Sequence, residues 1–114
     1  VFDGYKSIGK IEKAKADFKK AEIEIQQYKA KSQLELNKVN RQLRDAENKV
    51  SLSMLDLERS QEAYRIKSNR FTQGLEKTTD LLESETQMFK KELDYLQALF
   101  EYKYTQEYLK FLTK

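Results

Sequence analysis

The reactive side chains of this chain are limited to carboxylates, amines, guanidinium groups and hydroxyls. Its 114 residues include no cysteine and no histidine, which removes thiol chemistry, imidazole acid–base chemistry and disulfides. The hydroxyls of Ser and Thr therefore have no imidazole base to activate them. We expect no catalytic residues, no metal ligands and no cofactor, and we do not expect the chain to be an enzyme.

The densest group of carboxylates follows Gly74, the one glycine after position 9. Its members are Glu76, Asp80, Glu83 and Glu85. Carboxylates are favourable in the first turn of a helix, so the group indicates a helix start. Asp80 and Glu83 have the spacing of a capping box, and we predict the N-cap at Thr79 or Asp80. Arg70 either pairs with a carboxylate across this turn or lies near the end of the preceding helix, where a cation is favourable.

The composition indicates long helices. The chain has no proline and three glycines, apolar residues make up 39% and charged residues 36%, which disfavours sandwiches, barrels and doubly wound folds that need many turns. Basic and acidic residues are interspersed with a net charge of +3, so no nucleic-acid-binding stripe is indicated. No apolar run approaches the roughly 18–20 residues of a membrane span.

A seven-residue repeat of apolar residues runs through the first part of the chain. Near the N-terminus it comprises Ile11, Phe18 and Ile25, interleaved with Ala14, Ala21 and Tyr28. Farther along it comprises Leu36, Leu43, Val50, Leu57, Tyr64 and Phe71, interleaved with Val39 and Ala46. This spacing is typical of a coiled-coil seam.

The last part of the chain carries two apolar stripes. One comprises Leu81, Met88, Tyr95, Tyr102 and Leu109. The other comprises Leu82, Phe89, Leu93, Leu96 and Phe100. An apolar arc this wide is more than a two-stranded seam requires, so we expect this helix to contact at least two other helices.

The fold class that follows is all-α, a long antiparallel helical hairpin with its tip at Gly74, where a left-handed conformation costs glycine little. We predict a lead-in segment at residues 1–7, helices at 8–72 and about 80–113, and a tip turn at 73–79. The helices would be roughly 95 Å and 50 Å long. The apolar positions between Ile11 and Tyr28 then have no partner within the chain, and we expect the chain to oligomerise or to belong to a larger protein.

Three stretches resemble the outer-membrane efflux protein family of TolC-like channel-tunnels, and together they cover essentially the whole chain. Residues 2–5 look like the family's aromatic-x-Gly-Gly start of its long helix, with Tyr5 in place of the second glycine. Residues 69–83 look like its hairpin tip, Arg-[Tyr/Phe]-x-x-Gly followed by Asp-[Leu/Val]-Leu. Residues 98–102, followed by Leu109 and Leu112, look like its returning helix.

The resemblance implies one periplasmic hairpin of a trimeric exit duct for multidrug efflux or type I secretion, in the outer membrane of a Gram-negative bacterium. It implies docking onto a periplasmic adaptor coupled to an inner-membrane pump. The implied docking residues are Arg70, Phe71, Gly74, Leu75, Thr78, Thr79 and Leu82. Asp80 and Glu83 are implied to line the pore constriction, and the membrane would be reached only through a β-barrel missing from this stretch. Glu76 stands where better-known members carry a basic residue.

Two alternatives stay open. A coiled-coil hairpin of the adaptor protein would carry an Arg-x6-Leu-x6-Ser pattern, whereas Arg70 is followed seven residues later by Lys77. A generic structural coiled coil would leave the tip sequence and the unequal helix lengths unexplained.

Overall fold

The computed structural model describes residues 2–114, with side chains from Gly4 onward. This part of the chain folds into two helices, α1 (Phe2–Thr72) and α2 (Thr78–Leu112), without a strand. The predicted all-α helical hairpin is therefore confirmed. The chain divides into two compact units, Val1–Lys38 and Val39–Lys114.

The first unit is helical from Phe2 onward. The sequence predicted a lead-in segment at residues 1–7, whereas residues 2–7 belong to α1. Val1 lies outside the described residues. Gly4 and Gly9 lie at the start of α1, but each costs a helix only about 1 kcal/mol relative to alanine. With no proline to interrupt the hydrogen-bond ladder, the helix continues through both glycines.

Every side chain described between residues 4 and 31 is exposed. The exposed set includes the large apolar residues Ile11, Phe18, Ile25 and Tyr28. These are the positions of the N-terminal heptad repeat, so the first unit presents a complete apolar stripe to the solvent.

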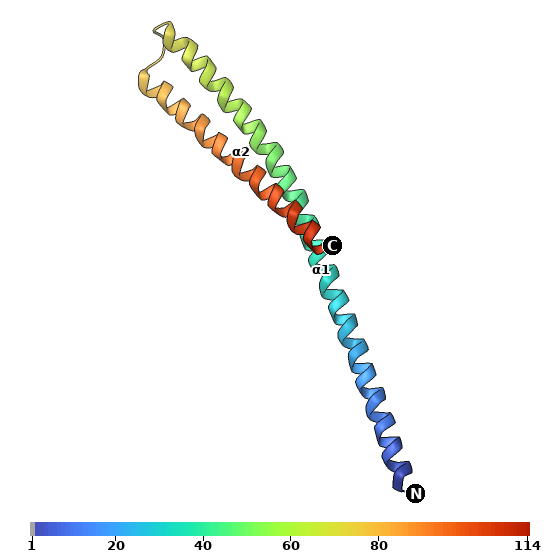
Figure 1. Ribbon diagram of the computed structural model, residues 1–114. Coiled ribbons are helices and arrows are strands. Elements are labelled where there is room, and N and C mark those ends of the chain that lie inside the picture. The colour runs from blue at the N-terminus through green and yellow to red at the C-terminus, as the bar shows by residue number, and fades with distance from the viewer. Residues whose placement is uncertain (1) are drawn as a thin grey trace. The chain divides into compact units, whose positions relative to one another are not determined.

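The second unit is an antiparallel pair made by the rest of α1 and by α2, joined at the tip (Figure 1). The predicted seam of α1 faces α2: Val39 and Ala46 are buried, while Leu43, Val50, Leu57 and Tyr64 are half-buried. On α2 the stripe that begins at Leu81 is half-buried along its length. The coiled-coil seam predicted from the heptads is confirmed from Val39 to Tyr64, whereas Phe71, its last predicted position, is exposed.

Small and polar residues occupy the alternate positions of this seam. Ser84 and Ala98 are the two buried residues of α2, and Ser53 and Ser60 take equivalent places on α1. An ion pair between Lys49 Nζ and Glu101 Oε2, 3.2 Å apart, joins the two helices and shows their register. At that register the half-buried Val50 lies about level with the buried Ala98.

The predicted end of α1 agrees with the structure, and the predicted start of α2 does not. α1 ends at Thr72, as predicted. The N-cap of α2 is Lys77, with φ −76° and ψ 146° and no side-chain cap hydrogen bond, so the predicted N-cap at Thr79 or Asp80 is wrong. The chain needs only residues 75–77 after Gly74 to reverse direction, and Asp80 falls in the first turn, where a carboxylate still favours the helix dipole.

Neither helix of the described part is long and apolar enough to cross a bilayer. Some exposed polar residues are linked within a single helix. Arg65 donates a hydrogen bond of 2.6 Å from Nη2 to Oε1 of Glu62. This bond holds the pKa of the Glu62 carboxyl below its ordinary value, so the pair supports the helix at neutral pH and is lost as the pH falls through that lowered pKa.

Candidate functional site

The tip is a compact turn built on backbone hydrogen bonds. The amide of Leu75 donates to the carbonyl of Arg70 at 2.8 Å, and the amide of Gly74 donates to the carbonyl of Phe71 at 3.0 Å. These two bonds form a Schellman motif, which requires a left-handed residue just past the helix end. Gly74 provides it with φ +74°, and its predicted role as the helix breaker is confirmed.

An ion pair closes the turn on one side. Arg70 Nε lies 3.0 Å from Glu76 Oε2, and the Glu76 side chain is only 15% exposed. Of the two roles considered for Arg70, the structure selects pairing across the tip. Glu76 is thereby set apart from the other carboxylates of the acidic group, because its charge is compensated by the guanidinium group.

The residues expected to dock a partner form an exposed cap around this turn. Leu75 is 63% exposed, and Phe71 and Leu82 are also exposed apolar side chains. Thr78 and Thr79 are exposed in the first turn of α2. A Cβ atom added at Gly74 would meet nothing within 4 Å, so the backbone there is open to close approach. The structure thus brings the predicted docking residues together at one end of the hairpin.

Asp80 and Glu83 lie one turn apart at the start of α2. Asp80 is half-buried and Glu83 is exposed. Glu83 borders a shallow depression that it shares with Lys67 and Ser84. Lys67 of α1 therefore borders the same depression as the Glu83 carboxylate. The two other carboxylates near the start of α2, Asp80 and Glu85, do not line this depression.

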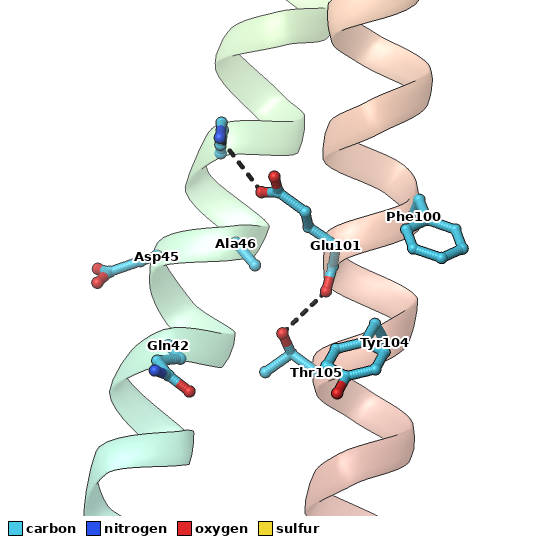
Figure 2. Close-up of a pocket in the computed structure, with 8 residues that line it drawn as sticks. Gln42, Asp45, Ala46, Phe100, Glu101, Tyr104 and Thr105 are labelled. Carbon is cyan, nitrogen blue, oxygen red and sulfur yellow. Dashed lines mark hydrogen bonds and ion pairs between the residues drawn. The ribbon is translucent and has the colours of Figure 1, made fainter.

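A second feature is a shallow groove of about 560 Å³ in the side of the hairpin (Figure 2). Its α1 side is formed by Gln42, Asp45, Ala46 and Lys49, and its α2 side by Phe100, Glu101, Tyr104 and Thr105. The rings of Phe100 and Tyr104 lie along the same edge. The Lys49–Glu101 ion pair crosses from one helix to the other at the groove, and Thr105 Oγ1 donates to the Glu101 carbonyl at 2.8 Å.

The groove, the Lys49–Glu101 pair and the buried Ser84 and Ala98 were not identified from the sequence. A signal for the last two existed, since each follows a residue of the Leu81 stripe by three, the second position of a heptad seam. The groove and the ion pair depend on the register between two segments about fifty residues apart, which periodicity within one helix does not specify.

The two surface features described are the exposed apolar cap at the tip and the groove beside the Lys49–Glu101 pair. Within the described residues, no three acidic side chains gather closely enough to hold a metal ion. No known family model matches the chain, and neither the curated proteins nor the solved structures include a significant match to it.

Proposed function

We propose that this chain is a periplasmic hairpin of a trimeric outer-membrane exit duct, serving multidrug efflux or type I secretion in a Gram-negative bacterium. In this proposal the tip docks onto a periplasmic adaptor that is coupled to an inner-membrane pump. The proposal combines the resemblance of the tip sequence to TolC-like channel-tunnels with the geometry of the tip.

The observation that carries the proposal is an exposed apolar cap on a rigid turn. Leu75 and Phe71 flank a glycine that has open space around its missing Cβ. A partner backbone can therefore approach Gly74 closely while its apolar side chains contact the cap. The Schellman bonds and the Arg70–Glu76 ion pair hold the turn in one conformation before any partner arrives, which lowers the entropic cost of docking.

The acidic residues have a second role in this proposal. In a closed tube, Asp80 and Glu83 from several hairpins would form a ring at its narrow end. Like charges at close range repel, and a ring of carboxylates attracts cations. Such a ring suits an aperture that opens only when an adaptor spreads the tips.

Docking at the tip is tested in the full-length duct protein by changing Leu75 and Leu82 to Asp, singly and together. Both side chains are exposed, so the hairpin should fold normally. Placing a charge in an apolar contact should weaken adaptor binding by about tenfold or more for each change, equivalent to about 1.4 kcal/mol. Export of a fluorescent substrate and co-purification of the adaptor are measured, with trimer formation as the check on assembly.

Gln61→Asp serves as the matched control, because it adds the same charge at an exposed position of α1 away from the tip. A generic structural coiled coil is the competing function, favoured by the long seam alone. It predicts that Leu75→Asp and Leu82→Asp behave like Gln61→Asp. Undiminished export in the double variant would remove the docking role.

A further inference from the structure

α2 carries an apolar face that nothing in the second unit covers, called here the outer stripe. Its members are Leu82, Phe89, Leu93, Leu96, Phe100, Tyr104 and Phe111, all exposed. Leu93 is 67% exposed and Phe100 71%. At 100° per residue these positions fall within an arc of about 80° on the helix. They form one continuous surface, separate from the half-buried stripe that packs on α1.

The first unit carries an uncovered stripe of its own, called here the N-terminal stripe. Its members are Ile11, Ala14, Phe18, Ala21, Ile25 and Tyr28, all exposed. Phe18, at its centre, is 73% exposed. Large and small residues alternate along this stripe from Ile11 to Ile25, whereas the outer stripe consists of large residues only.

The two stripes have the same spacing. Residues 14, 18, 21 and 25 are separated by steps of four, three and four, and so are residues 89, 93, 96 and 100. Two parallel helices with this spacing can place apolar residues of both at each level of a shared seam. With Phe18 level with Leu93, Ala14 meets Phe89 and Ala21 meets Leu96, so a small side chain faces a large one at two of the four levels.

Charge complements the apolar match. Residues 4–31 hold eight basic and four acidic groups, net +4, while Thr78–Leu112 holds four basic and seven acidic groups, net −3. The net charge is distributed unevenly along both segments. It is +4 within residues 4–20 and −3 within residues 78–94, and the remaining parts are neutral. A parallel alignment joins the basic part to the acidic part, whereas an antiparallel one would separate them.

Length fits as well. Residues 4–31 form 28 residues of helix, roughly 42 Å, and α2 has 35 residues, roughly 52 Å. The N-terminal stripe of one copy can therefore lie entirely on the outer stripe of another.

We propose that the N-terminal stripe of a second copy of this chain packs in parallel along the outer stripe of α2, with Phe18 level with Leu93. Each copy carries both surfaces, so a dimer that makes the contact twice would bury all four apolar stripes. Phe100 and Tyr104 also line the groove in the side of the hairpin, and the docked helix covers both rings. The contact belongs to the chain itself and does not rest on the proposed role in an exit duct.

Disulfide trapping tests the register, since the chain has no cysteine of its own. Phe18→Cys and Leu93→Cys are prepared as separate variants, mixed, equilibrated and oxidised. Phe18→Cys is mixed with Leu52→Cys as the matched control, because Leu52 is exposed on α1 to a similar extent, 64%. We expect the first mixture to give mainly the mixed 18–93 disulfide and the second to give no excess of the 18–52 disulfide.

Sedimentation equilibrium tests the surfaces. The unmodified chain should be a dimer whose dissociation constant rises with salt concentration. Phe18→Lys and Leu93→Lys should each raise that constant at least about tenfold, and Leu52→Lys should not. Circular dichroism checks that the helices persist in all three variants.

A monomeric chain over the whole concentration range would overturn the proposal. So would a dimer that Phe18→Lys leaves intact, or trapping that favours 93–93 disulfides, which would indicate pairing of two α2 helices. Because these measurements use the isolated chain, their failure is distinct from a failure of adaptor docking.

Discussion

Gly74 is the residue on which the hairpin turns, and its importance is a matter of backbone conformation. Its φ of +74° lies in the left-handed region, which costs most other residues about 1–2 kcal/mol. The space around its missing Cβ is empty, so crowding places no demand on this position. Any loss of stability on substitution of Gly74 therefore measures backbone strain directly.

Replacing Gly74 by Ala should destabilise the hairpin by about 1–2 kcal/mol, and Gly74→Asn should cost less because asparagine tolerates the left-handed region. Urea unfolding followed by circular dichroism measures both. Gly9→Ala is the matched control, since Gly9 is helical and also has open space around it. That change should stabilise the helix by up to about 1 kcal/mol. Equal effects at the two glycines would contradict the strain argument.

The Arg70–Glu76 ion pair decides between the two roles that the sequence left open for Arg70, pairing across the tip or a position near the end of α1. The pair spans the turn from the last residues of α1 to the connection, and the low exposure of Glu76 distinguishes it from the other ion pairs of the chain. Lys49–Glu101 has both side chains about half exposed, where an ion pair contributes at most about 1 kcal/mol. The cross-helix pair therefore shows which residues of the two helices lie level and contributes little to the stability of the hairpin.

At the scale of the elements, the seam between α1 and α2 is narrow. Its most buried positions are Val39 and Ala98, at 0% and 1% exposed, and its other alternate positions include serines. Half-buried Lys67 and Lys91 also fall on it, contributing their aliphatic stems. A seam of this kind gives close approach of the helices with little apolar area, so its stability depends on few residues.

Ala98→Leu should push the helices apart and destabilise the hairpin by about 1–3 kcal/mol, because the added atoms have no space in the seam. Ala63→Leu makes the same chemical change at an exposed position of α1 and should leave stability within about 0.5 kcal/mol. Thermal unfolding of the two variants side by side provides the comparison. A similar melting temperature for both would show that Ala98 is not held between the helices.

At the scale of the whole molecule, apolar surface exceeds what the chain covers by itself. The N-terminal stripe and the outer stripe of α2 are both exposed, and large contiguous exposed apolar patches usually mark an interface. Both the proposed duct and the proposed dimer supply a cover for them. In the proposed duct, neighbouring hairpins would lie on α2. In the proposed dimer, the N-terminal stripe of a second copy would lie there.

The helicity of the isolated chain should therefore depend on its concentration. Dilution should lower the melting temperature, since association stabilises the folded state by mass action. The region of residues 4–31 should lose helicity first, because its side chains have no partner within their own unit. Hydrogen exchange across a dilution series measures both effects. A melting temperature independent of concentration would contradict the need for a partner.

The two helices, the break at Gly74 and most of the seam of α1 follow from the sequence, because apolar periodicity and the lack of turn formers act locally along the chain. It placed the end of α1 correctly and the start of α2 wrongly. The start of α2 depends on the number of residues that the turn needs to reverse the chain. The capping-box spacing of Asp80 and Glu83 does not specify that number. The pairing of Arg70 with Glu76 depends on the conformation of the turn, which the sequence pattern does not specify. The contact of Lys49 with Glu101 and the groove beside it depend on the register between two antiparallel helices. That register is a property of the packed pair and cannot be obtained from the periodicity of either helix alone.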